Sequence, residues 1–240
     1  MENRERAVTP LEALRSRLGK MTERIIFRLQ DRTGLPLNPP VYEPSAVPIS
    51  GRSSISFLEF AVQGLETYHA SLGRYEYPDQ HPIISAVLPP SLATRSLVEV
   101  QPLPHVEINL RDKLLPFYCD TVLPKLCEPS DNPDTYGETA FLDADVLELL
   151  NERINIGRYV ARTKVEDDPS IWQIVSNTNE LIGKLKDPKQ EERVMASVHA
   201  SAERHGLRAD IAELVFRWVI ERTIDVEIAY LQGIPQSDTK

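Results

Sequence analysis

Two basic side chains stand at a spacing that suits an anion-binding site. Arg153 and Lys164 are eleven residues apart, which is almost three turns of an α-helix, so on one helix both project from one face about 16 Å apart along the axis. The residues between them on that face are small or short: Gly157, Val160 and Ala161. One interpretation is a hollow that holds an anion between two cations. The other is a solvated basic face with ion pairs to residues such as Glu148 or Asp167.

A carboxylic acid lies on an apolar side of the last part of the chain. Thr223 and Glu227 are four residues apart, so on a helix they share a side with Ile220 and Tyr230. An apolar setting disfavours a charged carboxylate and raises its pKa, and a protonated acid can donate a hydrogen bond. The alternative interpretation is a surface glutamate that pairs with a neighbouring helix.

Arg15 and Glu191 have plain structural interpretations. Arg15 lies between Leu14 and Leu18, where an arginine at the edge of an apolar stripe buries its aliphatic stem. Glu191 follows a helix-capping sequence that begins at Asp187, and an acidic group interacts favourably with a helix N-terminus.

Helices must position these side chains, because apolar residues recur at steps of three and four and no stretch alternates like a strand. The sequence predicts an all-α, single-domain multi-helix bundle over residues 1–240, with flexible termini at 1–8 and 235–240. The predicted helices span 10–33, 53–76, 109–127, 139–166, 170–186, Asp187 to Gly206 and Asp210 to Gly233.

The middle of the chain is rich in proline. Of 19 prolines, 15 lie between Pro36 and Pro133, so loops and interrupted helices are expected there. The helix over 109–127 contains Pro116 and Pro124 and is predicted to be kinked or split. For the helix over 53–76 the predicted apolar side consists of Phe57, Phe60, Ala61, Leu65, Tyr68 and Leu72.

Composition argues against several classes of partner. The net charge of -9 repels nucleic acid and anionic lipid, and no basic stripe offsets it. No apolar run approaches the length of a membrane span and the first residues lack a signal-peptide pattern, so we expect a cytoplasmic protein. Cys119 and Cys127 are predicted to be free, largely buried thiols. The five histidines show no metal-ligand spacing, nucleotide-binding motifs are missing from the sequence, and we therefore expect no metal and no cofactor.

One stretch carries a specific resemblance. Residues 152–164 read ERINIGRYVARTK and resemble the active-site helix of the eukaryotic-type chorismate mutases, which reads roughly SRRIHxGKFVAExK. Residues 11–18 and 23–27 look like the first helix of that family. Further segments are similar in the same order: 41–43, 75–79, 191–194 and 219–231.

The resemblance implies an isomerase that converts chorismate to prephenate in phenylalanine and tyrosine biosynthesis. It implies that Arg15 and Arg153 hold the two carboxylates of chorismate, for which a guanidinium is well shaped. Lys164 would contact the ether oxygen and a nearby carboxylate. The reaction is pericyclic, so no nucleophile, metal or cofactor is required.

The remaining site residues follow from the same resemblance. Protonated Glu227 would donate a hydrogen bond to the ether oxygen, Thr223 would help to hold a carboxylate, and Glu191 would accept from the ring hydroxyl. Asp187 stands where the family has asparagine, which adds negative charge near an anionic ligand. As a helix N-cap, Asp187 has a structural explanation as well.

The effector site of regulated family members is altered in this sequence. The family's paired arginines are replaced by Gly73-Arg74, and its Gly-Ser stretch by Gly137-Glu138. We therefore predict weak or absent feedback regulation by tyrosine or tryptophan. The family also implies a homodimer with a complete site in each chain.

Two other functions stay open at this point. A relative in specialised metabolism would act on an amino- or isochorismate, which the change at Asp187 would suit. A catalytically silent helical dimer would have little reason to keep all six catalytic positions together.

Overall fold

The computed structural model describes residues 10–77, 79–93, 104 and 106–234, with no side chains described for 10–12. Over these ranges the chain is helical, and the sole β-type pairing is an isolated bridge between Ile49 and Arg52. The predicted all-α class is confirmed. The termini predicted to be flexible, 1–8 and 235–240, lie outside the described residues.

Three long helices begin and end where their capping residues predicted. They are α1 (Pro10–Arg32), α9 (Pro188–His205) and α10 (Ala209–Gly233). Asp187 caps α9 by accepting a hydrogen bond from the Gln190 N–H at 3.1 Å. Gly206 ends α9 with φ 74°, a left-handed conformation that costs glycine little.

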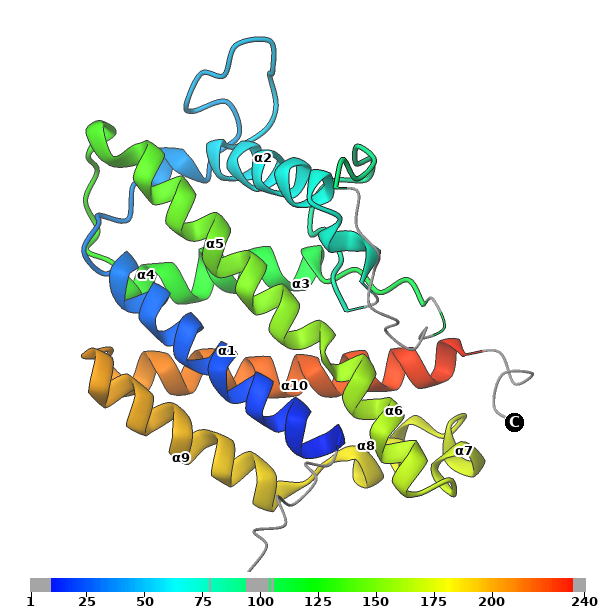
Figure 1. The fold of residues 1–240 in the computed structure, drawn as a ribbon. Helices are drawn as coiled ribbons and strands as arrows, with labels where there is room; N and C mark the ends of the chain where they lie inside the picture. Colours follow the sequence, from blue (N-terminus) through cyan, green and yellow to red (C-terminus); the bar gives the residue numbers. More distant parts are fainter. Residues whose placement is uncertain (1–9, 78, 94–103, 105, 235–240) are drawn as a thin grey trace, which may run out of the picture.

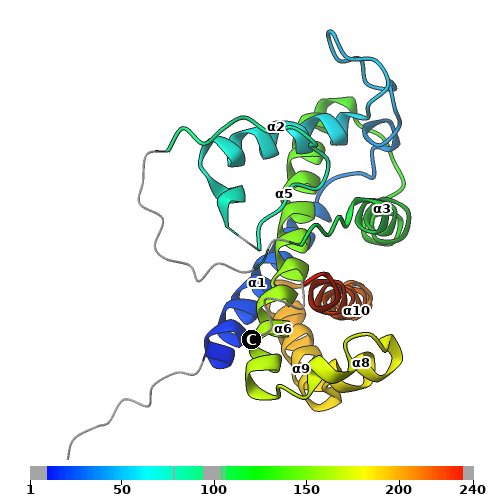
Figure 2. The ribbon, with the colours of Figure 1, turned by 90° about the vertical axis from the view of Figure 1, so that its right-hand side faces the viewer.

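The long helices form one core. α5 (Tyr136–Asn155) packs against α1, α10 and α2 (Phe57–Ser71), and α9 packs against α1 and α10. α5 crosses in front of α10 with α1 beside it (Figure 1), and a quarter turn shows α10 and α3 (Arg111–Pro116) nearly end-on (Figure 2). The side chains at the centre of this core are fully buried, including Ile25, Leu29, Leu147, Leu150, Val215 and Phe216.

The helix predicted over 139–166 is interrupted at Ile156. α5 ends at Asn155 and α6 (Gly157–Asp167) begins two residues later. The Asn155 side chain donates to the Asn151 carbonyl at 3.0 Å, and a side chain bonded to the carbonyl four residues back bends a helix. A Cβ on Gly157 would lie 2.8 Å from the Thr223 carbonyl oxygen, so the lack of a side chain at Gly157 lets α6 approach α10 closely.

The second helix differs from its prediction in extent and in its buried face. α2 begins at Phe57, capped by Ser56 and Glu59 in a capping box, and ends at Ser71 before Gly73. The buried residues are Leu58, Val62, Glu66 and Ala70, whereas three members of the predicted apolar side are exposed: Phe60, Tyr68 and Leu72. The predicted apolar side is therefore confirmed for Phe57, Ala61 and Leu65, which are partly buried against the core. It was wrong for Phe60, Tyr68 and Leu72, because residue spacing alone does not reveal which edge of the face meets the core.

The proline-containing middle helix is split, as predicted. It consists of α3, the π-helix η3 (Phe117–Val122) and α4 (Leu123–Leu126). The helix predicted over 170–186 is also split, into α7 (Ile171–Ile174) and α8 (Thr178–Leu185). That break was missed although Asn177 caps α8 by accepting from the Glu180 N–H.

Short helical turns lie between the longer helices. The turns are η1 (Pro39–Val41), η2 (Arg74–Glu76) and η4 (Pro133–Thr135). Cys119 is half-buried, Cys127 is buried, and both are free thiols. Among the described helices, none is long and apolar enough to cross a membrane.

Candidate active site

A cavity of about 430 Å³ lies where α1, α6, α8, α9 and α10 meet the C-terminal end of α5. The N-terminal parts of α1 and α9 converge there on α6 and α8, in the lower part of Figure 1. All seven residues predicted from the sequence to bind substrate line it: Arg15, Arg153, Lys164, Asp187, Glu191, Thr223 and Glu227. The fold thus collects on one cavity residues that are up to 212 positions apart in the chain, since 227 − 15 = 212.

Lys164 and Glu227 form an ion pair in the wall of this cavity. The Lys164 ammonium donates to Glu227 Oε2 at 2.7 Å and to the Leu185 carbonyl at 2.6 Å. The alternative in which Lys164 belongs to a solvated face is therefore wrong. Its partner comes from α10, so the pair joins α6 to α10 and to the end of α8.

Glu227 is almost completely buried, with 3% of its surface exposed. Burial raises the pKa of its carboxyl group to about 7, although Lys164 and Arg153 favour the charged form. The acid and its conjugate base are therefore both populated near neutral pH. A dianionic ligand in the cavity would add negative charge and favour the protonated form further.

Arg153 is buried, with 4% of its surface exposed. Its Nε atom has no hydrogen-bond partner among the described residues. Burial lowers the pKa of Arg153 to about 10, opposed by the charge of Glu227, so the guanidinium stays charged at neutral pH. A buried cation with unused donors is costly, and an anionic ligand would satisfy it.

The other four residues differ in how free their polar groups are. Arg15 is exposed at the mouth of the cavity, and Glu191 is half-buried on the first turn of α9. The Thr223 hydroxyl donates to the Val219 carbonyl at 2.7 Å, so its hydrogen is used within α10. Asp187 is exposed and is engaged in capping α9.

Sequence reasoning missed the apolar wall and several polar lining residues. Leu14, Leu18, Val194, Ile220 and Ile224 line the cavity. Leu14 and Leu18 belong to the stripe that the 3–4 spacing assigned to helix packing, and no local signal separates a cavity wall from a core. Polar residues missed are Asp168, Lys184, Lys186 and Gln190.

The hollow was predicted to lie over the small residues between the two cations, and in the structure it lies beside most of them. Gly157 packs against Thr223 and Val226 of α10, and Ala161 is buried in a second apolar cluster with Val165 and Ile228. Of the three small residues, Val160 alone lines the cavity. The small side chains therefore permit close packing of α6 on α10, and the space between the cations lies beside that contact.

The three positions predicted as remnants of an effector site lie outside this cavity. Arg74 donates to Glu152 at 3.1 Å and to Gln80 at 2.9 Å. Gly137 and Glu138 lie in the first turn of α5, at the end away from α6 (Figure 1).

The chemistry available in the cavity is electrostatic. Arg15, Arg153 and Lys164 supply three cations, and Glu227 supplies a carboxyl group that can exchange a proton near pH 7. Within the described part of the chain, no group of three or more histidine, cysteine or acidic residues could hold a metal ion. Fold and site thus define an all-helical protein with a cavity whose wall combines basic, acidic and apolar side chains.

Comparisons with known proteins identify the family. The family model described as chorismate mutase type II matches residues 135–228. Chorismate mutase 2 of Arabidopsis thaliana is 32% identical over 203 residues, which cover 83% of this chain and 76% of that protein. The chorismate mutase of Schizosaccharomyces pombe is 28% identical over 92% of this chain and 94% of its own. The chain belongs to the chorismate mutase family.

Solved structures of relatives share the fold. The chloroplast chorismate mutase from Zea mays is 26% identical with a TM-score of 0.76, over 97% of each chain. A structure of AtCM1 with tyrosine bound in an allosteric site is 27% identical with a TM-score of 0.83, over 95% of this chain and 97% of that one.

Proposed function

We propose that this chain catalyses the rearrangement of chorismate to prephenate in phenylalanine and tyrosine biosynthesis. The observation that carries the proposal is that all seven residues suggested by sequence line a single cavity. Membership of the chorismate mutase family supports the same reaction. In this reaction one carbon–oxygen bond of the enolpyruvyl side chain breaks while a carbon–carbon bond to the ring forms, so atoms balance without a co-reactant.

The cationic end of the cavity would hold the substrate in a reactive shape. Arg153 and Arg15 would each take one carboxylate of chorismate, and the Thr223 hydroxyl would support one of them after rotating away from Val219. Fixing both carboxylates restricts the flexible side chain to the compact conformer in which the new bond can form. The apolar wall would exclude water and strengthen these interactions.

Lys164 and Glu227 would act at the ether oxygen, where negative charge grows as the carbon–oxygen bond breaks. Lys164 lies 2.7 Å from Glu227, so a single atom can meet both donors. Donors that are already positioned stabilise such charge without reorganising. Glu227 must be protonated to donate, which its raised pKa permits, and Glu191 would accept from the ring hydroxyl.

The test is the loss of chorismate absorbance when purified protein is added, with the product identified as prephenate. Arg153→Ala is the control for contaminating enzyme, because it removes the buried cation. Activity in the wild type that disappears in the variant would support the proposal. A folded protein that converts amino- or isochorismate but not chorismate would replace it with the specialised-metabolism function.

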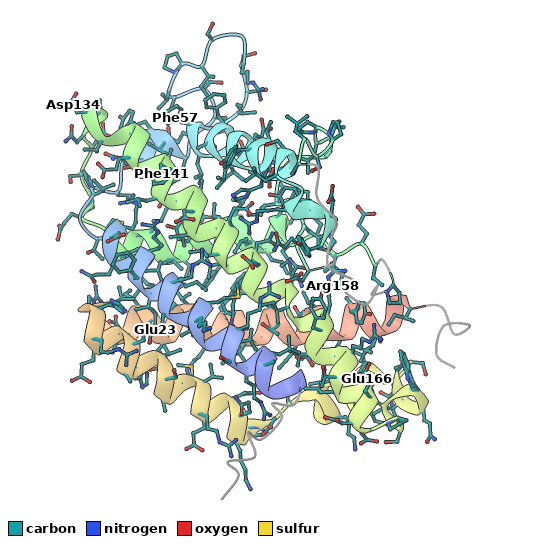
Figure 3. All side chains as sticks on the ribbon, viewed as in Figure 1. Glu23, Phe57, Asp134, Phe141, Arg158 and Glu166 are labelled. Carbon is teal, nitrogen blue, oxygen red and sulfur yellow. The ribbon has the colours of Figure 1, made fainter. Side chains whose placement is uncertain are left out.

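We further propose that the chain forms a homodimer. Large apolar side chains are exposed on α1, α2 and α5, with Phe27 46%, Tyr68 60% and Phe141 58% exposed. Phe141 lies on α5 near its N-terminal end (Figure 3). Burial of these side chains against a second copy would remove apolar surface from water. Sedimentation at micromolar concentration measures the mass, and a monomer would rule the dimer out.

We propose that feedback regulation by tyrosine or tryptophan is weak or absent. The Arg74 guanidinium is engaged by Glu152 and Gln80, which leaves it fewer donors for an amino-acid carboxylate. The half-saturating chorismate concentration should therefore stay within about twofold when tyrosine or tryptophan is added. A severalfold shift would contradict this. We also propose a cytosolic location; the relatives carry both cytosolic and chloroplastic names.

A further inference from the structure

A second, smaller cavity of about 140 Å³ opens beside the first, between α1 and α9. Five residues line both cavities: Arg15, Leu18, Arg153, Gln190 and Val194. The four others are Gly19, Thr22, Arg193 and Ser197. Since more than half of its lining is shared, the smaller space is an annex of the candidate active site.

The annex has a strongly one-sided charge. Arg15, Arg153 and Arg193 line it, and none of its described lining residues is acidic. The main cavity, by contrast, contains acidic residues from α6, α9 and α10. Three guanidinium groups around one small space repel one another, and a negative charge placed among them is attracted by all three.

The donors in the annex are only partly used. Arg153 is buried and its Nε atom makes no hydrogen bond in the described part of the chain. Among the described residues, Arg193 makes one long hydrogen bond, to Gln190 Oε1 at 3.5 Å. The Thr22 hydroxyl is engaged by the Leu18 carbonyl at 3.0 Å. The arginines therefore keep N–H groups for a ligand.

The size of the annex limits what can enter. Liquid water takes about 30 Å³ per molecule, so the annex has room for a few atoms but not for a substituted ring. A carboxylate or a phosphate-sized oxyanion fits both the volume and the bidentate geometry that guanidinium groups prefer.

We propose that the annex binds an anionic oxygen group, and that Arg193 is a third binding guanidinium beside Arg15 and Arg153. The proposal rests on the proposed function only where the occupant is a carboxylate of the substrate in the main cavity. The other source of the same chemistry is a free oxyanion that binds next to the substrate. No role was predicted for Arg193 from the sequence.

Steady-state kinetics with chorismate test the first source. Arg193→Gln should raise KM about tenfold with kcat within about twofold, because the contact serves binding in ground and transition states alike. Arg193→Lys should restore part of the loss. Arg24→Gln is the matched control, because Arg24 is an exposed arginine of α1 that lines neither cavity.

Calorimetric titration with inorganic phosphate tests the second source and requires no catalysis. Phosphate binding that is lost in Arg193→Gln and kept in Arg24→Gln, with KM unchanged, would assign the annex to a free oxyanion. If Arg193→Gln alters neither KM nor phosphate binding, the annex is not an anion site. If the wild type does not convert chorismate, titration with chorismate and with phosphate still measures whether Arg193→Gln weakens anion binding. Failure of the proposed reaction can therefore be told apart from failure of the annex proposal.

Discussion

Two buried clusters of charged and polar groups lie along the same helix and differ in how completely they are satisfied. Near the N-terminal half of α5, Asp143 receives hydrogen bonds from Arg32, Tyr42 and Tyr118 at 2.8, 2.6 and 2.7 Å. The remaining Arg32 nitrogens donate to the Leu35 and Leu37 carbonyls and to Tyr42. At the other end of α5, Arg153 is also buried, and its Nε atom has no hydrogen-bond partner among the residues that the structure describes.

The difference separates structural charge from binding charge. In both clusters the removal of ions from water is unfavourable, but in the first cluster hydrogen bonds and ion pairs with protein groups offset that cost. In the second cluster the described protein groups leave the Arg153 Nε without an acceptor, and burial raises the pKa of Glu227 to about 7 despite its two cationic neighbours. Substitution in the first should therefore change stability, and substitution in the second should change activity.

The largest effect is expected for Asp143→Ala. It leaves the Arg32 cation and two tyrosine hydroxyls buried without their acceptor, so the free energy of unfolding should fall by about 3–5 kcal/mol. Asp145→Ala is the control, because Asp145 pairs with Arg28 at 2.6 Å in a partly exposed position and should cost no more than about 1 kcal/mol. Urea unfolding measures both, and equal costs would remove the distinction between the clusters.

Arg153→Met should have the opposite signature. The catalytic efficiency kcat/KM should fall by about 10²–10³-fold, while the free energy of unfolding stays equal or rises by about 1 kcal/mol, because a desolvated cation is replaced by an apolar side chain. Kinetics and urea unfolding on one preparation provide the comparison. A loss of stability as large as that of Asp143→Ala would show that Arg153 is a structural ion.

Glu227→Gln sharpens the comparison through pH. In the wild type, kcat/KM should fall as pH rises through about 7, because the pKa of Glu227 is raised to about 7 and only the acid form donates. The kcat profile should fall at higher pH, since the bound dianion favours the protonated acid. Glutamine donates at every pH, so the variant should show no such decline, whereas the exposed control Glu221→Gln should keep it. A flat wild-type profile from pH 5 to 8.5 would contradict the assignment.

The smallest effect is expected for Asp187→Asn. Asparagine caps a helix as well as aspartate does, so stability should change by no more than about 0.5 kcal/mol. Removing a negative charge from the cavity lining should lower KM for chorismate by about twofold. Steady-state kinetics at low salt measure the change, and a raised KM would mean that Asp187 contributes to binding.

Local signals predicted the helices that carry caps, and tertiary contacts decided the rest. Asp187 and Gly206 bracket α9 as predicted. The close approach of α6 to α10 is a contact between Gly157 and Thr223, which lie 66 residues apart along the chain (223 − 157 = 66). The buried face of α2 likewise depends on its packing against α5, which residue spacing does not specify.

The residues predicted for the site do line one cavity, and a physical reason makes some of them recognisable from sequence. Arg153 and Glu227 are recognisable because a charged residue among apolar neighbours needs an explanation wherever the helices lie. Leu14 and Ile220 are ordinary apolar residues until the cavity exists. Arg193, for which we propose a binding role, has no such signal, because an exposed arginine on a polar helix start needs no explanation.

The close contact at Gly157 also sets the register of one helix against another. Gly157 meets Thr223, and two turns further along α6 Lys164 meets Glu227 one turn further along α10. A slip of α6 by one turn, about 5.4 Å, would place Lys164 opposite position 223 or 231, where no acid stands. Figure 3 labels Arg158 and Glu166, which lie near the two ends of α6. The lack of a side chain at Gly157 thus keeps Lys164 and Glu227 opposite each other.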